Sequence, residues 1–510
     1  MGCGRIKRSM QRKIPATMAT QHPDNAGAPY WEKDGDGFVS TQEEIQECTS
    51  AFRDLGCQEF MWDWEGKYVD EAVVDKLFHT YHDYFKRHQL GRDVFLTFRI
   101  PNIWQEAGYS LARAMMAIHT AESFARDLKF HTPPLFEVIL PMTRSADNII
   151  HIQRTFSQLS TFTGKLFKDP SYFSYLNVLP LLERVEDLAF PRKLLDRYLV
   201  LHRREYGSKP KYLRLHIARS DPALNSGLVP AVVAGKIALS EYHRFGRDHG
   251  IEVFPAIGVG TLPFRGSLSP ERISEFFREY SGIRTVYIQS AFRYDFPLPT
   301  VKAAITRLNR ELPKTPVQLM PSKEIAEARR ICRMFVPHYC TTVETIAPVI
   351  NQIANQVPAR RERKLHVGLF GYSRSVGKQR LPRAIPFTAA LYSLGVPPEL
   401  IGTGRGLREA QKNGIDIERY YRNFRSDLKL AGRYLNKENL ARLAARHRGW
   451  KSVQEDVAYV EQYLGTELGP RSKSDRLHHH FASNVVFLWE EGLPVTSEII
   501  QSGKLRKSLG

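Results

Sequence analysis

An α/β fold, a (β/α)8 TIM-type barrel with additional helices mainly in the C-terminal third, is what this sequence predicts. Eight short apolar runs occur along its 510 residues, most of them at intervals of about 30 to 45 residues. Helix-length segments separate these runs, and most runs end in a charged or hydrogen-bonding residue. Strands that alternate with helices favour a parallel barrel, whose strand ends meet at one mouth. The runs cover residues 59–63, 94–99, 136–143, 178–183, 212–221, 253–258, 285–289 and 366–374.

The eighth run, 366–374, stands apart from the other seven. About 75 residues separate it from the seventh run, which is long for a single crossover connection. Helical spacing of apolar residues predicts that helices fill this interval at 301–312, 325–334 and 343–356. Apolar runs with polar ends also occur in doubly wound parallel sheets, which are the alternative fold.

Three regions follow one another along the chain. Residues 1–19 contain five basic residues and no acidic one, and are expected to form a disordered basic tail. Residues 20–382 are expected to hold the barrel, preceded by a polar loop with a histidine and by a helix that begins near residue 40. Residues 383–510 are expected to be helical and, since no low-complexity linker intervenes, to pack on the barrel as part of a single structural unit. Helices are predicted there at 384–394, 417–436, 437–448 and 484–491.

Composition narrows the class of protein. The chain is 42% hydrophobic and 25% charged, and it has no apolar run of the length that spans a membrane. Five cysteines without a CxxC pair fit neither a disulfide framework nor a zinc ribbon and favour the reduced cytoplasm. The net charge of +19 keeps nucleic-acid binding as an alternative, but the basic residues are spread out and no nucleic-acid-binding motif accompanies them. We therefore expect a cytoplasmic protein that binds neither membranes nor nucleic acids.

Polar residues at the ends of the predicted strands are candidates for a functional site. In a barrel these residues converge although they are far apart in the sequence. Carboxylates are suitable ligands for a hard divalent cation, and arginines bind phosphorylated or carboxylated anions. The candidates are Arg99, Glu183, Asp221, Gln289 and Arg374.

A histidine in the polar loop is a further candidate. His22 is followed by Pro23, which restricts its backbone to extended conformations, in the segment 20–25 (TQHPDN). An imidazole titrates near neutral pH and suits proton transfer, although a single loop histidine is more often an ordinary surface residue.

Several segments, in the same order along the chain, resemble archaeal-type phosphoenolpyruvate carboxylase. The resemblance covers residues 14–510 and includes long motifs, which makes coincidence implausible. The segments are 20–25, 95–102, 179–183, 218–225, 258–267, 288–294, 365–374 and 383–387.

The resemblance implies a reaction and a metal site. Bicarbonate would attack the phosphoryl group of phosphoenolpyruvate, giving carboxyphosphate and an enolate. Carboxyphosphate would then break down to CO₂ and phosphate, and the enolate would take up the CO₂ to give oxaloacetate. Glu183 and Asp221 match the family's metal-binding pair, and the ion is expected to be Mg²⁺ or Mn²⁺.

The resemblance also assigns arginines to the anions, which a planar guanidinium binds with two parallel hydrogen bonds. Arg99 and Arg383 match residues that hold the phosphate of phosphoenolpyruvate. Arg265 matches a residue that holds bicarbonate, and Arg374 one that steadies carboxyphosphate or CO₂.

Three more positions follow from the resemblance. His22 matches the histidine that manages the proton as carboxyphosphate collapses. Gln289 and Arg293 match a motif on the seventh predicted strand, and they are expected either to contact the substrate or to support residues that do.

The sequence departs from the longer bacterial and plant carboxylases at two places. Those enzymes have a histidine and an extra arginine where this chain has 257–260 (IGVG), and a lysine where it has Leu224. A homotetramer is expected from the resemblance alone. The alternative function is another metal-dependent barrel lyase of the phosphoenolpyruvate/pyruvate group, which would use Glu183 and Asp221 without needing His22.

Overall fold

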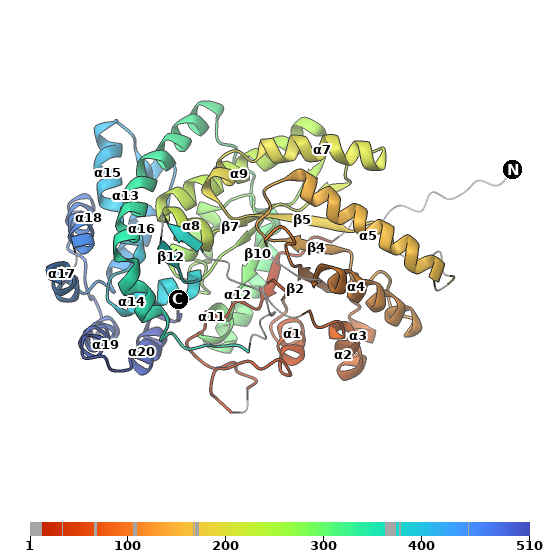
Figure 1. Cartoon of the computed structure of the whole chain (residues 1–510), viewed down its shortest axis with the longest axis horizontal. Helices are drawn as coiled ribbons and strands as arrows, with labels where there is room; N and C mark the ends of the chain where they lie inside the picture. The colour runs from red at the N-terminus through yellow and green to blue at the C-terminus, as the bar shows by residue number, and fades with distance from the viewer. Residues whose placement is uncertain are drawn as a thin grey trace.

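The structure is a computed structural model, and it describes residues 13–32, 34–65, 69–105, 110–166, 168, 173–362, 374–376, 379–446 and 448–510. Within this part of the chain, eight parallel strands form a closed barrel at the centre of the molecule (Figure 1). The predicted barrel is therefore confirmed. Its strands are β1 (Thr17–Thr20), β2 (Glu59–Asp63), β3 (Phe95–Arg99), β4 (Glu137–Leu140), β5 (Asn177–Leu182), β7 (His216–Ala218), β9 (Ala256–Gly258) and β10 (Thr285–Ile288).

The strand that closes the barrel differs from the prediction. β1 pairs in parallel with both β2 and β10, so it fills the place expected for residues 366–374. Arg374 instead begins β11 (Arg374–Val376), which pairs antiparallel with β12 (Gln379–Leu381) outside the barrel, and residues 366–373 lie outside the described part of the chain. The prediction of a disordered tail is likewise wrong for residues 17–19, which are buried in β1.

Helices surround the barrel on its outside, as expected for crossover connections (Figure 1). Short helices α6 (Val185–Ala189), α8 (Ser220–Ser226) and α11 (Ser290–Tyr294) begin almost directly after β5, β7 and β10. The other helices around the barrel are α1 (Glu44–Arg53), α2 (Val73–Thr80), α3 (His82–Arg87), α4 (Ser110–Asp127), α5 (Ala146–Leu166), α7 (Arg192–Tyr206), α9 (Leu228–His249), α10 (Ile273–Glu279) and α12 (Leu298–Glu311).

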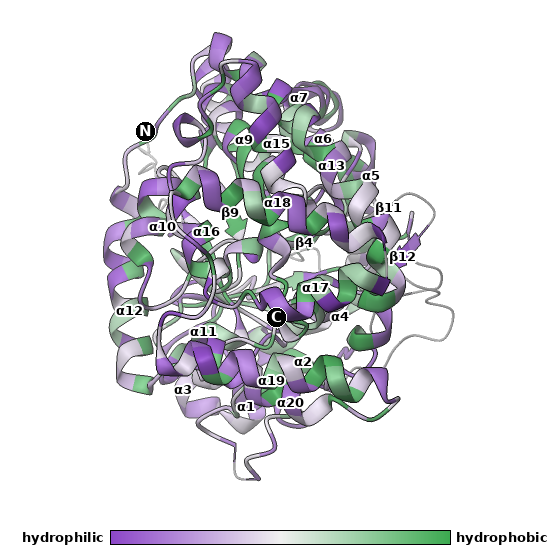
Figure 2. Ribbon diagram, turned by 90° about the vertical axis from the view of Figure 1, so that its left-hand side faces the viewer, coloured by the Kyte–Doolittle hydropathy of each residue, from purple (hydrophilic) through white to green (hydrophobic). Residues whose placement is uncertain are grey.

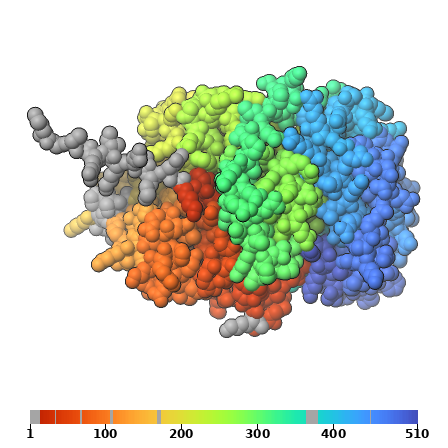
Figure 3. Space-filling view, turned by 180° about the vertical axis from the view of Figure 1, so that it is seen from behind, coloured from red at the N-terminus to blue at the C-terminus, as the bar shows by residue number. Residues whose placement is uncertain are grey.

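After the last barrel strand the chain is mainly helical. The two helices predicted around residues 325–356 are one helix, α13 (Ser322–Ala354), which continues through Pro337 and Pro348 and packs against α9 and α15. The helices after residue 383 occupy one side of the molecule, and both polar and apolar residues occur along them (Figures 2 and 3). None of the helices in the described ranges is long and apolar enough to cross a membrane. These later helices are α14 (Ala384–Ser393), α15 (Thr403–Lys412), α16 (Phe424–Gly432), α17 (Lys437–Arg446), α18 (Arg448–Leu464), α19 (Lys473–Glu490) and α20 (Thr496–Arg506).

The interior of the barrel is filled in layers, and the filling determines where a ligand can bind. At the end where the strands begin, buried Arg214 donates hydrogen bonds to Glu59 and to Glu137. The next layer is mainly apolar and contains Met18, Met61, Ile139, Leu179, Leu181, Ala218 and Tyr287. Since these two layers leave the barrel packed, the open site lies at the mouth, where the strands end.

Candidate active site

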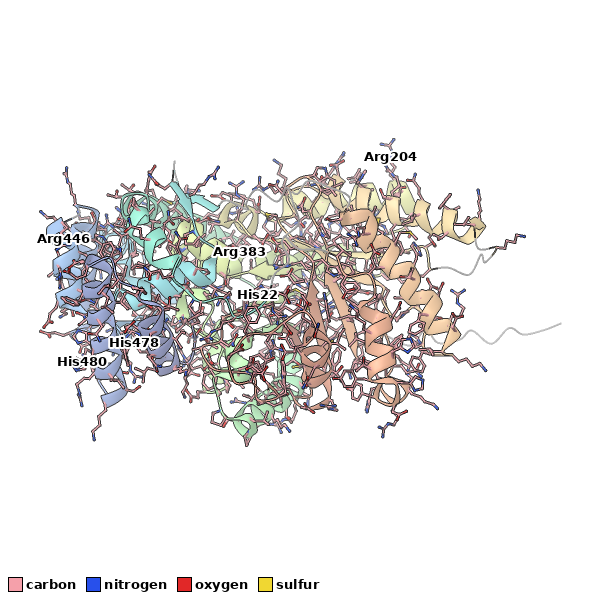
Figure 4. The ribbon with its side chains drawn as sticks, turned by 60° about the horizontal axis from the view of Figure 1, so that its bottom comes forward. His22, Arg204, Arg383, Arg446, His478 and His480 are labelled. Carbon is pink, nitrogen blue, oxygen red and sulfur yellow. The ribbon has the colours of Figure 1, made fainter. Side chains whose placement is uncertain are left out.

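A cavity of about 320 Å³ lies at this mouth, between the barrel and the N-terminal end of α14. It brings together five of the predicted site residues, and Figure 4 shows His22 and Arg383 in the central part of the molecule, where the C-terminal helices meet the barrel. The five are His22, Arg99, Asp221, Arg265 and Arg383. Glu65, Ser220, Arg360 and Arg361 also line the cavity.

A second, larger hollow of about 680 Å³ lies on the other side of Asp63, beside α1 and α2. Its lining has four carboxylates against two basic side chains, Lys76 and Arg113, whereas the smaller cavity is lined by five arginines against two carboxylates. The smaller cavity therefore fits an anionic substrate better.

Arg99 reaches the mouth because it is the last residue of β3. Its Nε and Nη2 donate hydrogen bonds to the two carboxylate oxygens of Asp63, at 2.8 and 2.7 Å, and Nη2 also lies 2.7 Å from Glu65 Oε2. Burial alone would lower the pKa of Arg99, but Asp63 and Glu65 raise it well above its ordinary value. The guanidinium is therefore permanently charged and held in one orientation.

Arg265 is almost fully buried, at 1% exposure, at the end of a short 3-10 helix (Pro263–Arg265). It donates to Ser220 Oγ at 3.1 Å, Asp24 Oδ2 at 3.0 Å, Gln289 Oε1 at 2.6 Å and the backbone oxygen of Gly510. Burial lowers the pKa of Arg265, and Asp24 opposes that shift. These contacts take four of the five guanidinium N–H groups, so one Nη2 hydrogen is left for a ligand.

The loop that carries His22 is fixed at several points. The ring Nδ1 lies 2.9 Å from Thr20 Oγ1, and the ring lies 6.3 Å from that of Tyr287, measured between centroids. The backbone oxygen of His22 accepts a hydrogen bond from Ser290 N at 3.3 Å. Further along the loop, Asp295 accepts hydrogen bonds from the backbone amides of residues 26 and 27, and burial raises the pKa of Asp295 to about 7.

In the segment 257–260, two glycines lie where a larger side chain would come very close to a neighbouring residue. A Cβ atom on Gly258 would lie 3.1 Å from the ring of Tyr287, and one on Gly260 would lie 3.2 Å from Arg265. Larger side chains at these two positions would therefore crowd Tyr287 and Arg265.

Gln289 and Arg293 do not line the cavity. Gln289 accepts the hydrogen bond from Arg265 described above, and so holds that guanidinium in place. Arg293 Nη2 donates to the backbone oxygen of Thr20 at 2.7 Å and to Glu47 Oε1 at 2.9 Å, behind the His22 loop. Both residues therefore position other parts of the site in this structure.

The two predicted metal ligands come from neighbouring strands. Glu183 directly follows β5, and its Oε2 accepts a hydrogen bond from Met142 N at 2.6 Å. Asp221 lies in the first turn of α8, just after β7, and lines the cavity. Each carboxylate interacts electrostatically with an arginine: Glu183 with Arg99, and Asp221 with Arg265.

Two carboxylates are residue types that suit a hard divalent cation with few protein ligands, and of the two only Asp221 lines the cavity. Carboxylate oxygens are the ligands that Mg²⁺ prefers, and Mg²⁺ usually keeps several positions for water and substrate oxygens. Among the described side chains, no group of three or more His, Cys, Asp or Glu could hold a metal ion. A cation bound by Glu183 and Asp221 would therefore complete its coordination with oxygens from water or substrate.

Some site residues were not predicted from the sequence. Asp63 ends a predicted strand, so the strand-end rule could have included it, whereas Glu65 lies two residues beyond the strand and carries no such signal. Asp24 lies in the recognised 20–25 segment, and its burial beside Arg265 depends on the fold. The side chain of Arg374 lies outside the described part of the structure, so its predicted role stays a prediction.

A parallel barrel whose mouth combines carboxylates, buried arginines and a histidine is typical of an α/β-barrel enzyme with an anion-binding site. A family model described as phosphoenolpyruvate carboxylase matches residues 14–510. The chain therefore belongs to the phosphoenolpyruvate carboxylase family, which are carboxy-lyases, and the predicted family is confirmed.

Relatives that match this chain over at least 93% of their own length are phosphoenolpyruvate carboxylases. Phosphoenolpyruvate carboxylase of Leuconostoc mesenteroides is 41% identical over 506 residues, covering 98% of this chain and 99% of the relative. That of the archaeon Metallosphaera sedula is 41% identical over 488 residues, covering 92% and 93%. That of Caldivirga maquilingensis is 35% identical over 522 residues, covering 98% and 100%.

Proposed function

We propose that this protein carboxylates phosphoenolpyruvate with bicarbonate to give oxaloacetate and phosphate, and so supplies four-carbon acids. The observation that carries the proposal is the cavity in which His22, Arg99, Asp221, Arg265 and Arg383 converge from distant parts of the chain. The reaction brings two anions together, and the five arginines that line this cavity provide positive charge for that.

Residues at different positions in the site are proposed to have different roles in the reaction. Arg99 and Arg383 would bind the phosphoryl group, and Arg265 would offer its remaining N–H group to bicarbonate. His22 would take up the proton when carboxyphosphate collapses. Arg374 is proposed to steady carboxyphosphate or CO₂.

The family is generally metal-dependent. We propose Mg²⁺ or Mn²⁺ as the ion, with Glu183 and Asp221 as its protein ligands. When bound, the cation would supply positive charge to stabilise the enolate. From the resemblance we also propose that the enzyme is cytoplasmic and a homotetramer.

The test is an assay for oxaloacetate, coupled to malate dehydrogenase, with phosphoenolpyruvate, bicarbonate and Mg²⁺ or Mn²⁺. Oxaloacetate should form only when bicarbonate is present, and phosphate should be released in equal amount. Turnover of phosphoenolpyruvate that does not depend on bicarbonate would instead favour another lyase of the phosphoenolpyruvate/pyruvate group.

Neutral substitutions of the phosphate-binding arginines should weaken phosphoenolpyruvate binding. Loss of a charge-assisted hydrogen bond costs about 1.5–3 kcal/mol, so Arg383→Gln should raise the KM for phosphoenolpyruvate by roughly 10- to 150-fold. Arg99→Lys should raise it less than Arg99→Gln, because lysine keeps the charge but lacks the planar fork. The KM is measured from initial rates at saturating bicarbonate. An unchanged KM in Arg383→Gln would show that Arg383 does not bind the phosphate.

Arg265→Gln should act on the other substrate. The expected result is a rise of about tenfold or more in the KM for bicarbonate, measured at saturating phosphoenolpyruvate. Arg272→Gln is the matched control. Arg272 lies seven residues further on, does not line the cavity, and pairs with Asp427 at a distance of 2.8 Å. Unchanged use of both substrates in Arg265→Gln would remove Arg265 from the site.

A further inference from the structure

Glu65 is one of two acidic side chains, with Asp221, in a cavity lined by five arginines. It is 1% exposed and lines the cavity together with Arg99 and Arg265. Its Oε2 lies 2.7 Å from Arg99 Nη2, while its Oε1 is buried and has no hydrogen-bond partner in the described part of the chain. A buried carboxylate oxygen without a partner is costly, so its position at this site calls for an explanation.

A third metal ligand would be one explanation, but the geometry does not support it. Within the described residues, no three His, Cys, Asp or Glu side chains lie close enough to hold one ion, and Glu65 therefore does not join Glu183 and Asp221 around a cation. The partner that Glu65 does have is Arg99.

Asp63 and Glu65 hold different parts of the same guanidinium. Asp63 takes the edge formed by Nε and Nη2, with one oxygen on each nitrogen. Glu65 forms an ion pair with the same nitrogen, with its Oε2 2.7 Å from Nη2, and Nη2 also belongs to the edge formed by Nη1 and Nη2. Asp63 lies outside the set of residues that line the cavity, whereas Glu65 lies within it. The edge that Glu65 covers is thus the edge that an anion in the cavity would use.

With two carboxylates paired to it, the charge of Arg99 is already balanced, so Arg99 attracts a phosphate dianion less than an unpaired guanidinium would. Because Asp63 already accepts from Nε and Nη2, a phosphate can form two parallel hydrogen bonds with Arg99 only at Nη1 and Nη2, and Nη2 is the nitrogen with which Glu65 pairs. Binding must therefore exchange one anion for the other.

We propose that Glu65 is an internal competitor for the phosphate group: its carboxylate occupies Arg99 in the empty site and is displaced when a phosphorylated substrate binds. The inference rests on the proposed role of Arg99 in binding phosphate. Glu65 keeps Arg99 aligned while the site is empty, weakens the binding of every phosphate ligand, and returns to Arg99 as the product phosphate leaves. It sets affinity and takes no part in bond making.

The test compares two isosteric variants, Glu65→Gln and Asp63→Asn, that should have opposite effects. Glu65→Gln should lower both the KM for phosphoenolpyruvate and the inhibition constant of inorganic phosphate by about three- to tenfold, because a competing charge is removed. Asp63→Asn should raise both constants, because Arg99 loses the paired hydrogen bonds to Asp63 that orient its guanidinium. The full-length enzyme is used at saturating bicarbonate, and calorimetric titration with inorganic phosphate gives a binding constant that does not depend on turnover.

Glu65→Asp is a second variant in case the glutamine variant folds poorly. Its shorter side chain draws the carboxylate back from Nη2, so phosphate should again bind more tightly. Weaker or unchanged phosphate binding in both Glu65 variants would overturn the inference. Arg99→Lys, measured alongside, separates the two proposals: if it weakens phosphate binding while the Glu65 variants do not strengthen it, only the inference about Glu65 fails. If Arg99→Lys changes neither constant, the assignment of Arg99 and the inference both fail.

Discussion

Asp221→Ala should abolish carboxylation, lowering kcat/KM by about a thousandfold or more, because the enolate would lose the cation that stabilises it. Asp221 follows β7 in the first turn of α8 and faces the cavity. Its carboxylate is proposed to bind an ion and not to stabilise the hydrophobic core, so the variant should still fold. Oxaloacetate formation would be followed over a range of Mg²⁺ and Mn²⁺ concentrations, together with direct binding of Mn²⁺ and thermal unfolding.

Glu183→Gln should give the same loss of carboxylation, but its result is harder to interpret. The carboxylate of Glu183 also accepts a hydrogen bond from Met142 N, so a change there disturbs the backbone as well. Glu186→Gln is a suitable control for both, since Glu186 is an exposed acid three residues further on, 3.3 Å from Arg184. Full activity in Asp221→Ala, or no change in Mn²⁺ affinity, would contradict the assignment of the metal pair.

His22→Asn should separate the two halves of the reaction. Phosphoryl transfer to bicarbonate should continue, because the arginines and the carboxylate pair remain. Carboxyphosphate should then fail to deliver CO₂ productively, and the enolate should be protonated to pyruvate. We expect oxaloacetate formation to fall by about 100- to 10,000-fold while phosphate release in the presence of bicarbonate falls much less.

Phosphate, pyruvate and oxaloacetate would be measured side by side in His22→Asn. Thr20→Val is the matched positioning variant, because it removes the hydroxyl 2.9 Å from Nδ1 but keeps the imidazole. It should show the same uncoupling to a smaller extent. Equal amounts of phosphate and oxaloacetate at the wild-type rate in His22→Asn would show that His22 has no part in the proton transfer.

Seven of the eight barrel strands could be located from the sequence because a buried strand has a local signal. Each of the seven is an apolar run at a position where a strand was found, and the residues at their ends include Arg99, Glu183 and Asp221. The motifs that carry the family resemblance are also local, and they led to His22, Arg265 and Arg383.

The eighth strand could not be located in this way. β1 has only four residues, two of which are threonines, and it lies next to a basic segment that resembles a tail. What makes it a strand is its pairing with β2 and with β10, and the register with β10 joins Met18 to Tyr287, far away in the sequence. Of the apolar run chosen in its place, 366–374, only Arg374 lies in the described part of the chain, and it pairs with Leu381 of β12.

The sequence by itself determined the barrel class, the family and the residue types that meet at the mouth, because strand periodicity and long motifs are properties of neighbouring residues. Only the tertiary structure decided which residues touch one another there. It placed Arg293 behind the His22 loop, joined Gln289 to Arg265, and set Glu65 against Arg99. The physical reason is that hydrogen bonds and charge pairs between distant segments depend on ring closure and burial, which no local pattern in the sequence records.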